Sequence, residues 1–452
     1  MTSQPSTVTL VSECLIKPLH DLSPEPKEPL YFTANELLRL NFRYTQQGLL
    51  FAKPSSPENK DFSKTSYLDD LKHSLSATLT HFHPLAARLA TRIQDSPASY
   101  VIYLDPENSP GVKFIYAKTD TTISDVLSPT YVPLIVDSFF DLNDAISHDG
   151  HTLPFLSIKV TELTDGIFIG VSVTHLFVDG TSLWHFMSSW SELFKSKDQI
   201  GIISRPPVIK RGSDLIRNLP FTHQDQFIER PEQMPNLVLK RFFSFSSASV
   251  ARLKKKANAE SDTQKISSLK ALSALLWRCV TRARRLPADS DTFCTLPVNN
   301  RPRMNPPLSE DYLGCPIDVV CGTTTVKDLM TNGLGWAAMK LDEAVTNHDD
   351  AAVKKGMEKW IRNPVVVKMN GLDRSNVVRV TNSPRFDIYG CEFGLGKPIT
   401  VRSGLANKAD GIMIMYPGPE GGGSVDVEIC LLPDAIMDLE RDEEFISALS
   451  SE

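Results

Sequence analysis

The sequence predicts an α/β protein with two similar-sized halves, each built on a mixed β-sheet flanked by helices. Its 452 residues are enough for two or three domains of ordinary size. Apolar residues recur at helical spacing in several segments and form β-branched runs in others. The strand-like segments do not alternate regularly with helices, so we expect mixed or antiparallel sheets and not a regular parallel one.

The first half opens with two expected helices. Residues 33–44 begin with Thr33, which can cap a helix, and Glu36 follows three residues later. Residues 67–90 have leucines four positions apart and are interrupted by Pro84. Four strand-like segments follow, which are rich in β-branched or aromatic residues: 100–106, 112–117, 156–160 and 167–173.

The last of these strands, 167–173, is apolar on both faces, which is typical of a central buried strand. After Gly180 the apolar period changes to that of a helix, with one apolar face extending to Phe194. Residues 196–222 are charged, contain two consecutive prolines and have no sustained period, so they are the predicted linker. The predicted domains are therefore 1–195 and 223–452.

The second half has its own set of strands and helices. A strand over 240–245 leads into a basic helix and then into an amphipathic helix over 267–286, which Ser267 can cap. Later segments have the composition of strands: 292–299, 377–382, 399–404, 411–417 and 425–432. Both halves therefore mix helices with strands, which is the basis for the α/β class.

Composition and charge argue against several classes of function. The formal net charge is −6 and the isoelectric point about 6.0, which does not favour nucleic acid or an anionic membrane as partner. The N-terminus has no basic region typical of a signal peptide, and no stretch approaches the ~20 apolar residues of a membrane span. The seven cysteines are scattered without CxxC spacing, so we expect no metal site and a reducing, cytoplasmic environment. We also expect a monomer.

The segment THLFVDG places a histidine, His175, directly after the buried strand. In α/β proteins, sites form preferentially at this edge of a sheet. An imidazole there, with one nitrogen exposed, is suited to act as a general base near neutral pH. Gly180 then permits a tight turn into the following helix. We therefore expect His175 to be catalytic.

Asp179 lies four residues after His175 and has two possible roles. It can orient His175 directly, as in a hydrolase triad. It can also turn away and hold the loop by pairing with an arginine, for which Arg301 and Arg303 are candidates. The four-residue offset through a tight turn favours the second role, in which Asp179 is structural.

No nucleophile with a recognisable pattern accompanies His175. The chain has no GxSxG elbow, and Cys391 lies in a glycine-flanked loop, although a free cysteine is usually a small core residue. Residues 392–398 lack the spacing of a phosphate-binding loop, and no dinucleotide-binding glycine pattern follows a strand. A lone base must then act on the substrate itself, by deprotonating an alcohol or amine that attacks an activated acyl group.

These residues resemble the plant BAHD acyltransferase family, whose members carry an HxxxD motif and a DFGWG motif. The matching runs, in the family's order, are FHPLAARL (82–89), HLFVDG (175–180), PVNNRPRMNPPL (297–308), YLGCPI (312–317), EFGLG (392–396) and VDVEICL (425–431). The likeness spans nearly the whole chain. It implies two chloramphenicol-acetyltransferase-like domains joined by a long crossover loop, with a solvent channel between them.

The resemblance further implies that acyl-CoA is a co-substrate, that no cofactor is permanently bound, and that a small alcohol or amine is the acceptor. His175 would take the acceptor proton in a ternary complex, and Asp179 would pair with Arg301. In the family a Thr and often a Trp face the oxyanion, eleven and nine residues before the DFGWG aspartate. The matching residues here are Thr381, which is retained, and Ser383, which departs from the pattern.

A second departure is EFGLG in place of DFGWG, a loop to which the resemblance gives a structural role through Glu392, Gly394 and Gly396. Glu392 keeps the charge with a longer reach, while Leu395 lacks the indole. Three residues match a stretch that contacts CoA in the family: Lys265, Ser267 and Ser268. A surface lysine beside a helix cap explains the same three residues, and both interpretations stay open.

Two other functions compete with acyl transfer. The runs VSECLIKPL (11–19) and TNSPRFDIYG (381–390) resemble a subgroup in which a relative became a CoA-independent lyase that releases salicylate from an isochorismate conjugate. The third alternative is a non-catalytic binding protein on the same scaffold. Intact His175 favours transfer, whereas Ser383 and EFGLG leave room for the lyase, and EFGLG is the only support for the binding protein. The sequence determines neither the acyl donor nor the acceptor.

Overall fold

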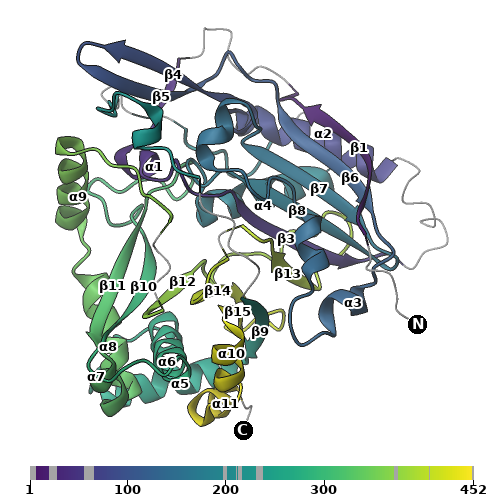
Figure 1. Ribbon diagram of the computed structural model, residues 1–452. Coiled ribbons are helices and arrows are strands. Elements are labelled where there is room, and N and C mark those ends of the chain that lie inside the picture. The colour runs from purple at the N-terminus through teal and green to yellow at the C-terminus, as the bar shows by residue number, and fades with distance from the viewer. Residues whose placement is uncertain are drawn as a thin grey trace.

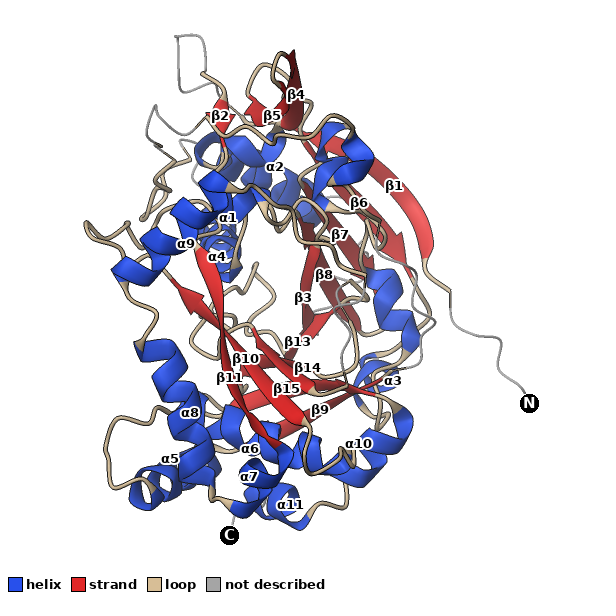
Figure 2. Cartoon of the chain, turned by 60° about the vertical axis from the view of Figure 1, so that its left-hand side comes forward, coloured by secondary structure: helices blue, strands red, loops and turns tan. Residues whose placement is uncertain are grey.

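The computed structural model describes residues 7–19, 28–54, 66–196, 201–209, 211, 216–230, 238–370, 375–406 and 408–449. Two six-stranded sheets dominate the fold, one in each half of the molecule (Figure 1). Turned by 60°, the sheet of the first half lies above that of the second half, and helices flank both (Figure 2). This architecture is the predicted two-domain α/β class.

The sheet of the first half has the strand order β1-β6-β7-β8-β3-β13. Its strands are β1 (Thr9–Ile16), β6 (Val112–Lys118), β7 (Leu156–Glu162), β8 (Gly166–Val173), β3 (Thr45–Ala52) and β13 (Thr400–Ser403). The β6–β7 pair is parallel and the other pairs are antiparallel, so the sheet is mixed. Every residue of β8 is buried, which confirms the central position predicted for this strand.

Both faces of this sheet are covered. Two long helices, α2 (Ser66–His81) and α4 (Gly180–Ser196), pack against each other and share an apolar core with Ile169 of β8. On the opposite face Phe168 joins a smaller core with Val126 of helix α3 (Ile123–Leu127). The turn that follows β8 therefore starts from a strand held rigidly between two apolar layers.

The first predicted helix, over 33–44, is much shorter than predicted. Helix α1 spans Ala34–Leu37, and its predicted capping box between Thr33 and Glu36 is present. The chain then leaves the helix, because the fully buried side chain of Asn41 donates to two backbone carbonyls from distant segments. Tertiary hydrogen bonds here override the local helical pattern.

The second predicted helix, over 67–90, gives way to a strand. Helix α2 ends before Pro84, whose ring disfavours a helical residue in front of it, and a short 3-10 turn follows. The chain continues as β4 (Arg88–Asp95), which pairs with β5 (Ala98–Asp105), and β5 pairs with β2 (Leu30–Tyr31). Of this small three-stranded sheet, only β5 is among the predicted elements, as the strand over 100–106.

The sheet of the second half has the order β11-β10-β12-β14-β15-β9. Its strands are β11 (Ile317–Thr325), β10 (Asp291–Asn299), β12 (Val377–Thr381), β14 (Ile412–Pro417), β15 (Val425–Leu431) and β9 (Leu239–Phe245). The pairs β10–β12 and β12–β14 are parallel and the others antiparallel. This second sheet is mixed too.

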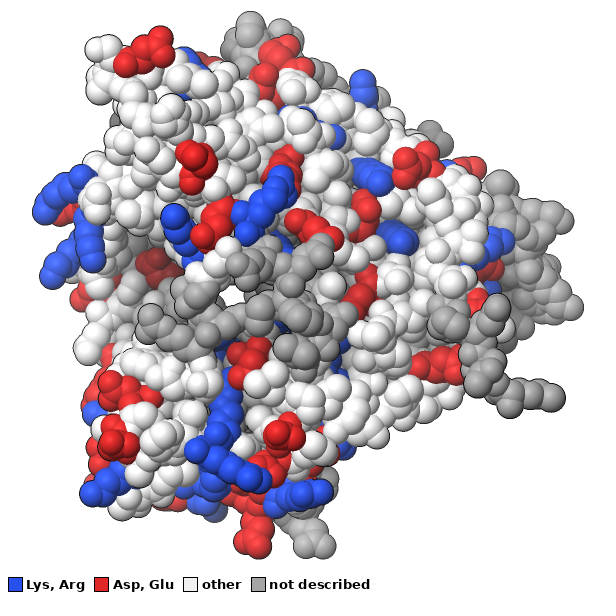
Figure 3. Space-filling view, viewed as in Figure 1, with Lys and Arg blue, Asp and Glu red and all other residues white. Residues whose placement is uncertain are grey.

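Helices cover the face of this sheet that points away from the first half (Figure 2). They are α5 (Ser247–Glu260), α6 (Ser268–Ala283), α7 (Val326–Thr331), α8 (Leu334–Thr346), α10 (Pro433–Leu439) and α11 (Glu443–Leu449), while α9 (Asp350–Arg362) lies against α1. Of the helices that the structure describes, none has the length and apolar character needed to cross a membrane. On the face shown in Figure 3, acidic and basic side chains are interspersed.

One strand crosses between the halves. Strand β13 comes from the second half of the chain but pairs antiparallel with β3, at the edge of the first sheet. Phe393, in the loop before it, belongs to the same apolar core as α2 and α4. The predicted boundary of the 223–452 unit therefore does not coincide with the sheets over this segment.

The described parts of the predicted linker, 196–222, lie against both halves. Val208 forms a bridge with Tyr312, and Leu219 forms one with Tyr100. The linker residues 197–200, 210 and 212–215 lie outside the described residues. The described part of the linker therefore contacts both halves of the molecule.

Candidate active site

The turn between β8 and α4 carries the predicted base, His175, two residues after the strand ends. Asp179 accepts a hydrogen bond from the backbone N–H of Ser182 at 2.8 Å, as a helix-capping residue does. A Cβ at Gly180 would lie 2.8 Å from the Phe386 ring, so a larger residue there would push the ring away. Strand β8, the helix cap by Asp179 and the close packing at Gly180 together fix the position of the His175 imidazole.

His175 is held from its Nδ1 side. Nδ1 lies 3.2 Å from the carbonyl oxygen of Val178 and 3.7 Å from Sγ of Cys315. Phe42 packs edge-on against the ring, with centroids 6.0 Å apart. Because a carbonyl oxygen only accepts, we assign the hydrogen of the neutral ring to Nδ1, and Nε2 keeps its lone pair. Nε2 is therefore the basic atom.

The surroundings keep this imidazole neutral. Burial lowers the pKa of His175 to about 4, assisted by the positive charge of Arg39 and opposed by the negative charge of Asp179. Arg39 is held by its bonds to the backbone carbonyls of Asn35 and of Ile317, the latter at 2.5 Å. At neutral pH the ring can thus accept a proton without first losing one.

Asp179 is directed to Arg301 in the second half of the chain. Nη1 of Arg301 lies 2.5 Å from Oδ2 of Asp179, and Nη2 lies 3.1 Å from Oδ1. The two side chains are 3 % and 1 % exposed, and Arg301 also donates to backbone carbonyls in 312–314. Arg303, the other sequence candidate, donates to backbone carbonyls elsewhere in the second half. The buried pair joins the turn that bears His175 to the other domain.

Thr381 and Ser383, the two predicted oxyanion residues, lie at the end of β12. The hydroxyl of Thr381 is 3.5 Å from a carbonyl oxygen of the neighbouring strand β14, and that of Ser383 accepts from a backbone N–H two residues on, at 3.3 Å. Phe386 places its ring against Gly180. The segment is thereby brought beside the turn that carries His175.

The EFGLG loop packs on the far end of α4. The hydroxyl of Ser191 accepts from the backbone N–H groups of Glu392, at 3.0 Å, and Phe393, at 3.3 Å. The partly exposed carboxylate of Glu392 pairs with Lys195 at 2.7 Å. Ser191 lies eleven residues after the start of α4, which corresponds to roughly 16 Å along the helix axis. The loop thus anchors to the end of α4 that is remote from the base.

Gly394 and Gly396 in this loop both have a left-handed backbone, with φ of +72° and +81°. A Cβ at Gly394 would lie 2.7 Å from the ring of Phe194, whereas a Cβ at Gly396 would meet open space. Both backbone conformations favour glycine, and the first position also requires it for space.

The three residues predicted to contact CoA lie at the start of α6: Lys265, Ser267 and Ser268. Ser267 caps the helix by accepting from the backbone N–H of Lys270 at 3.4 Å, and Lys265 is exposed. Helix α6 belongs to the helix layer of the second half (Figure 2). The cap is therefore present, and contact with CoA stays a prediction.

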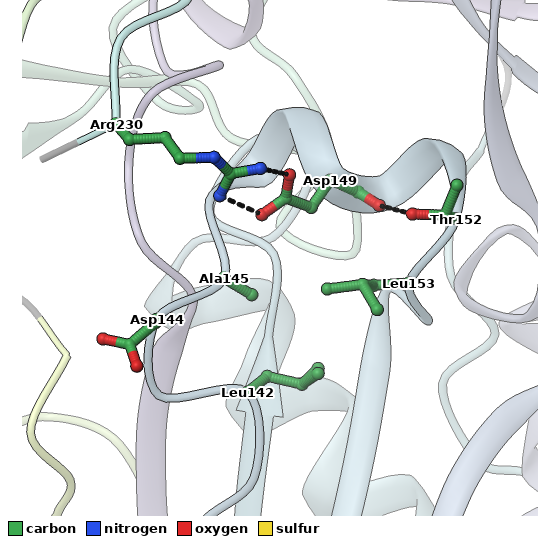
Figure 4. A pocket seen from close by; sticks show the side chains of 7 residues that line it. All are labelled: Leu142, Asp144, Ala145, Asp149, Thr152, Leu153 and Arg230. Atoms are coloured by element: carbon green, nitrogen blue, oxygen red, sulfur yellow. Dashed lines mark hydrogen bonds and ion pairs between the residues drawn. The ribbon is translucent and has the colours of Figure 1, made fainter.

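A separate pocket of about 430 Å³ opens in the first half, lined by Leu142, Asp144, Ala145, Asp149, Thr152, Leu153 and Arg230. Figure 4 shows the guanidinium of Arg230 reaching the carboxylate of Asp149, with a closest contact of 2.6 Å. The lining contains none of the predicted site residues. Two of its three charged side chains, those of Asp149 and Arg230, are already paired with each other.

Sequence reasoning missed Cys315 and Arg39, which both act on His175. It also missed a buried ion pair next to them, in which Arg211 donates to Glu36 at 2.8 Å and Glu36 accepts from the backbone N–H of Cys315 at 3.3 Å. The run YLGCPI and the capping box contain two of these residues. No local pattern indicates that they meet, since they are about 280 positions apart.

Fold and site together define a two-domain α/β enzyme in which a neutral histidine stands at the end of a central strand, beside an ion pair that joins the halves. The model of the Transferase family matches residues 6–446. The chain belongs to this family, the BAHD acyltransferases, as the sequence resemblance predicts.

Relatives of known sequence cover almost the whole chain. An uncharacterized acetyltransferase of Arabidopsis thaliana is 34% identical over 448 residues, covering 97% of this chain and 98% of that protein. BAHD acyltransferase DCR of the same plant is 30% identical over 457 residues, covering 97% and 92%.

Solved structures show the same fold. Vinorine synthase superposes with a TM-score of 0.74 at 20% identity and covers 99% of both chains. F. graminearum TRI101, in complex with coenzyme A and T-2 mycotoxin, superposes with a TM-score of 0.72 at 18% identity, covering 93% of this chain and 99% of that one. These likenesses confirm the predicted fold.

Proposed function

We propose that the protein transfers an acyl group from acyl-CoA to the hydroxyl or amine of a plant specialised metabolite, by direct attack in a ternary complex. One observation carries the proposal: a partly buried, neutral His175 whose Nδ1 faces the carbonyl of Val178 and whose Nε2 is left as a base. Membership of the BAHD family supports it. So does the coenzyme A bound in the TRI101 structure of the same fold.

In the proposed reaction, Nε2 of His175 takes the proton of the acceptor as its oxygen or nitrogen attacks the thioester carbonyl. The tetrahedral intermediate carries a negative oxygen, toward which the hydroxyl of Thr381 would donate. The intermediate collapses by breaking the carbon–sulfur bond, and the imidazolium returns its proton to the leaving CoA thiolate. A positioned base contributes about 10²–10⁴ in rate, and one oxyanion donor about 10²–10³.

The proposed chemistry limits the acceptor to a class of molecule, an alcohol or an amine. Similar proteins are named for an alcohol, as in the shikimate O-hydroxycinnamoyltransferase of Nicotiana tabacum, and for an amine, as in the agmatine hydroxycinnamoyltransferase of Oryza sativa. Both O- and N-acylation are therefore to be tested. The proposal includes a cytoplasmic monomer, and all seven cysteines are free thiols, which supports a reducing compartment.

The two alternatives, a CoA-independent lyase and a non-catalytic binding protein, have weaker support. The lyase rests on the runs 11–19 and 381–390, with room left for it by Ser383 and the EFGLG loop, and the binding protein rests on the EFGLG loop alone. The loop packs against the end of α4 that is remote from His175. Its altered sequence is therefore compatible with a role of His175 as general base. A non-catalytic binding protein gives no role to the basic Nε2 of a neutral imidazole.

The deciding experiment is thiol release by the purified protein. Acetyl-CoA and hydroxycinnamoyl-CoAs are crossed with shikimate, agmatine and pooled plant alcohols and amines, for the wild type and for His175→Ala. Acyl transfer predicts acceptor-dependent release that falls by about 10²–10⁴ in the variant. No release from any donor, together with no heat of CoA binding, would refute the proposal and favour one of the two alternatives.

A further inference from the structure

A cysteine that no sequence pattern singled out touches the predicted base. Sγ of Cys315 lies 3.7 Å from Nδ1 of His175, 140 residues earlier in the chain. Cys315 is fully buried, and it comes from the second half, just before β11. Through this thiol the second half of the molecule contacts the imidazole ring of His175.

Nδ1 has two neighbours and one hydrogen to give. The carbonyl oxygen of Val178, 3.2 Å away, only accepts, so the hydrogen lies on Nδ1 and the sulfur acts as its second, weaker acceptor. In the opposite tautomer Nδ1 would turn a lone pair toward the carbonyl, and Nε2 would no longer be basic. The two acceptors favour the same, productive tautomer.

We propose that Cys315 is a positioning residue for His175: its sulfur shares the Nδ1 hydrogen with Val178 and so keeps Nε2 as the free base. This rests on the proposed function, in which Nε2 is the atom that takes the acceptor's proton. Cys315 itself touches neither the acceptor nor the thioester in this reaction. It acts through the ring alone.

The position of the thiol is fixed by two buried ion pairs. The backbone N–H of Cys315 donates to Glu36 at 3.3 Å, and Glu36 is paired with Arg211. The preceding carbonyl, that of Gly314, accepts from Arg301 at 3.2 Å. The sulfur is therefore held from both sides, as an orienting group must be if it is to restrict another side chain.

A role as nucleophile does not fit this geometry. Burial raises the pKa of the Cys315 thiol to about 12, so the sulfur is not a thiolate at neutral pH. The thiol faces Nδ1, which already gives its hydrogen to a carbonyl, and not the basic Nε2. No acyl-cysteine intermediate is expected here.

Three substitutions at one position separate these roles. Cys315→Ser keeps an acceptor, Cys315→Ala removes it, and Cys315→Val removes it while filling the space, which keeps the test usable where the alanine variant fails to fold. We expect kcat to fall about 10-fold or more for Ala and Val with little change in KM, and to stay within about 3-fold for Ser. Nitrogen-15 NMR of the His175 ring should show a rise of the Nε2–H tautomer only in Ala and Val.

Cys294→Ala is the matched control, because Cys294 is an equally buried thiol in β10 of the second half. It should lose stability without any change in the tautomer. The proposal fails if Cys315→Val leaves both kcat and the tautomer unchanged. It also fails if Cys315→Ser is as inactive as Cys315→Ala and mass spectrometry finds an acyl group on Cys315. The NMR comparison needs no turnover, so it stands even where no acyl transfer is found.

Discussion

Asp179 and Arg301 form a two-pronged ion pair, with contacts of 2.5 and 3.1 Å, across the boundary between the two halves of the molecule. The carboxylate also caps α4 by accepting from the backbone N–H of Ser182. One short acidic side chain thus fixes the turn that bears His175 to both its own helix and the opposite domain. These contacts predict that Asp179 contributes to structure and not to proton transfer.

Asp179→Asn is therefore expected to lower stability more than rate. Removing one partner leaves the charge of Arg301 buried, which typically costs about 3–5 kcal/mol. The free energy of unfolding from urea titration should fall by that order, while kcat per correctly folded molecule stays near that of the wild type. A fully folded Asp179→Asn protein with a large loss of kcat would instead make Asp179 a partner of His175 in catalysis.

The pH profile should report the charge of Arg39. His175 acts as a base only when neutral, and its pKa of about 4 lies below the ordinary 6.5, so the rate is expected to rise with pH through about 4. Arg39→Gln removes a positive charge that lowers this pKa, so the acid limb of kcat/KM should move to higher pH. Burial remains, and the limb should stay below the ordinary value.

Arg303→Gln is the matched control for that profile. Arg303 also bonds two backbone carbonyls through its guanidinium, but its charge is not among the causes of the His175 shift. Its variant should keep the wild-type acid limb. Equal profiles for both variants would show that the charge of Arg39 has no influence on the base.

The two hydroxyls at the end of β12 should differ in importance. Thr381→Val removes the proposed oxyanion donor, and kcat is expected to fall about 10²–10³-fold. Ser383→Ala is expected to change kcat only a few-fold, because Ser383 stands where the family's pattern has a Trp, whereas Thr381 is the retained oxyanion residue. Steady-state kinetics with one acyl-CoA and one acceptor compares them, and equal losses would assign both residues to the oxyanion.

The glycines of EFGLG should affect stability and leave the chemistry intact. Gly396→Ala adds a side chain in open space to a left-handed backbone, which costs about 1–2 kcal/mol. Gly394→Ala should cost more, because its Cβ also meets the ring of Phe194. Thermal unfolding ranks the two variants, and a loss of kcat in a folded Gly396→Ala protein would contradict the structural role of the loop.

Much of the fold is visible in local patterns. Runs of β-branched and other apolar residues locate β7, β8, β14 and β15, and the apolar period after Gly180 locates α4. Patterns fail where tertiary contacts outweigh propensity. The chain after α1 is not helical, because the side chain of Asn41 donates to backbone carbonyls of distant segments. Strand β13 lies in the second half of the sequence but pairs with β3 in the sheet of the first half.

The site, too, has features that local sequence patterns reveal and features that only tertiary contacts create. A histidine after a buried strand is a local signal, and the placement of His175 follows from it. The ion pair of Asp179 with Arg301 comes from likeness to a family and from the awkward offset of the aspartate, while the contacts of His175 with Cys315 and Arg39 come from neither. These two contacts join residues about 140 positions apart, which no short window of sequence encodes.

The crossing of β13 has a consequence for synthesis. Strand β3 is flanked by β8 on one side and by β13 on the other, so a nascent chain that has not yet reached Thr400 presents β3 as an open edge. Exposed edges of this kind invite pairing with other chains. The first domain can complete its sheet only after residues 400–403 have been synthesised, and until then the open edge of β3 is a place where a chaperone can prevent wrong pairing.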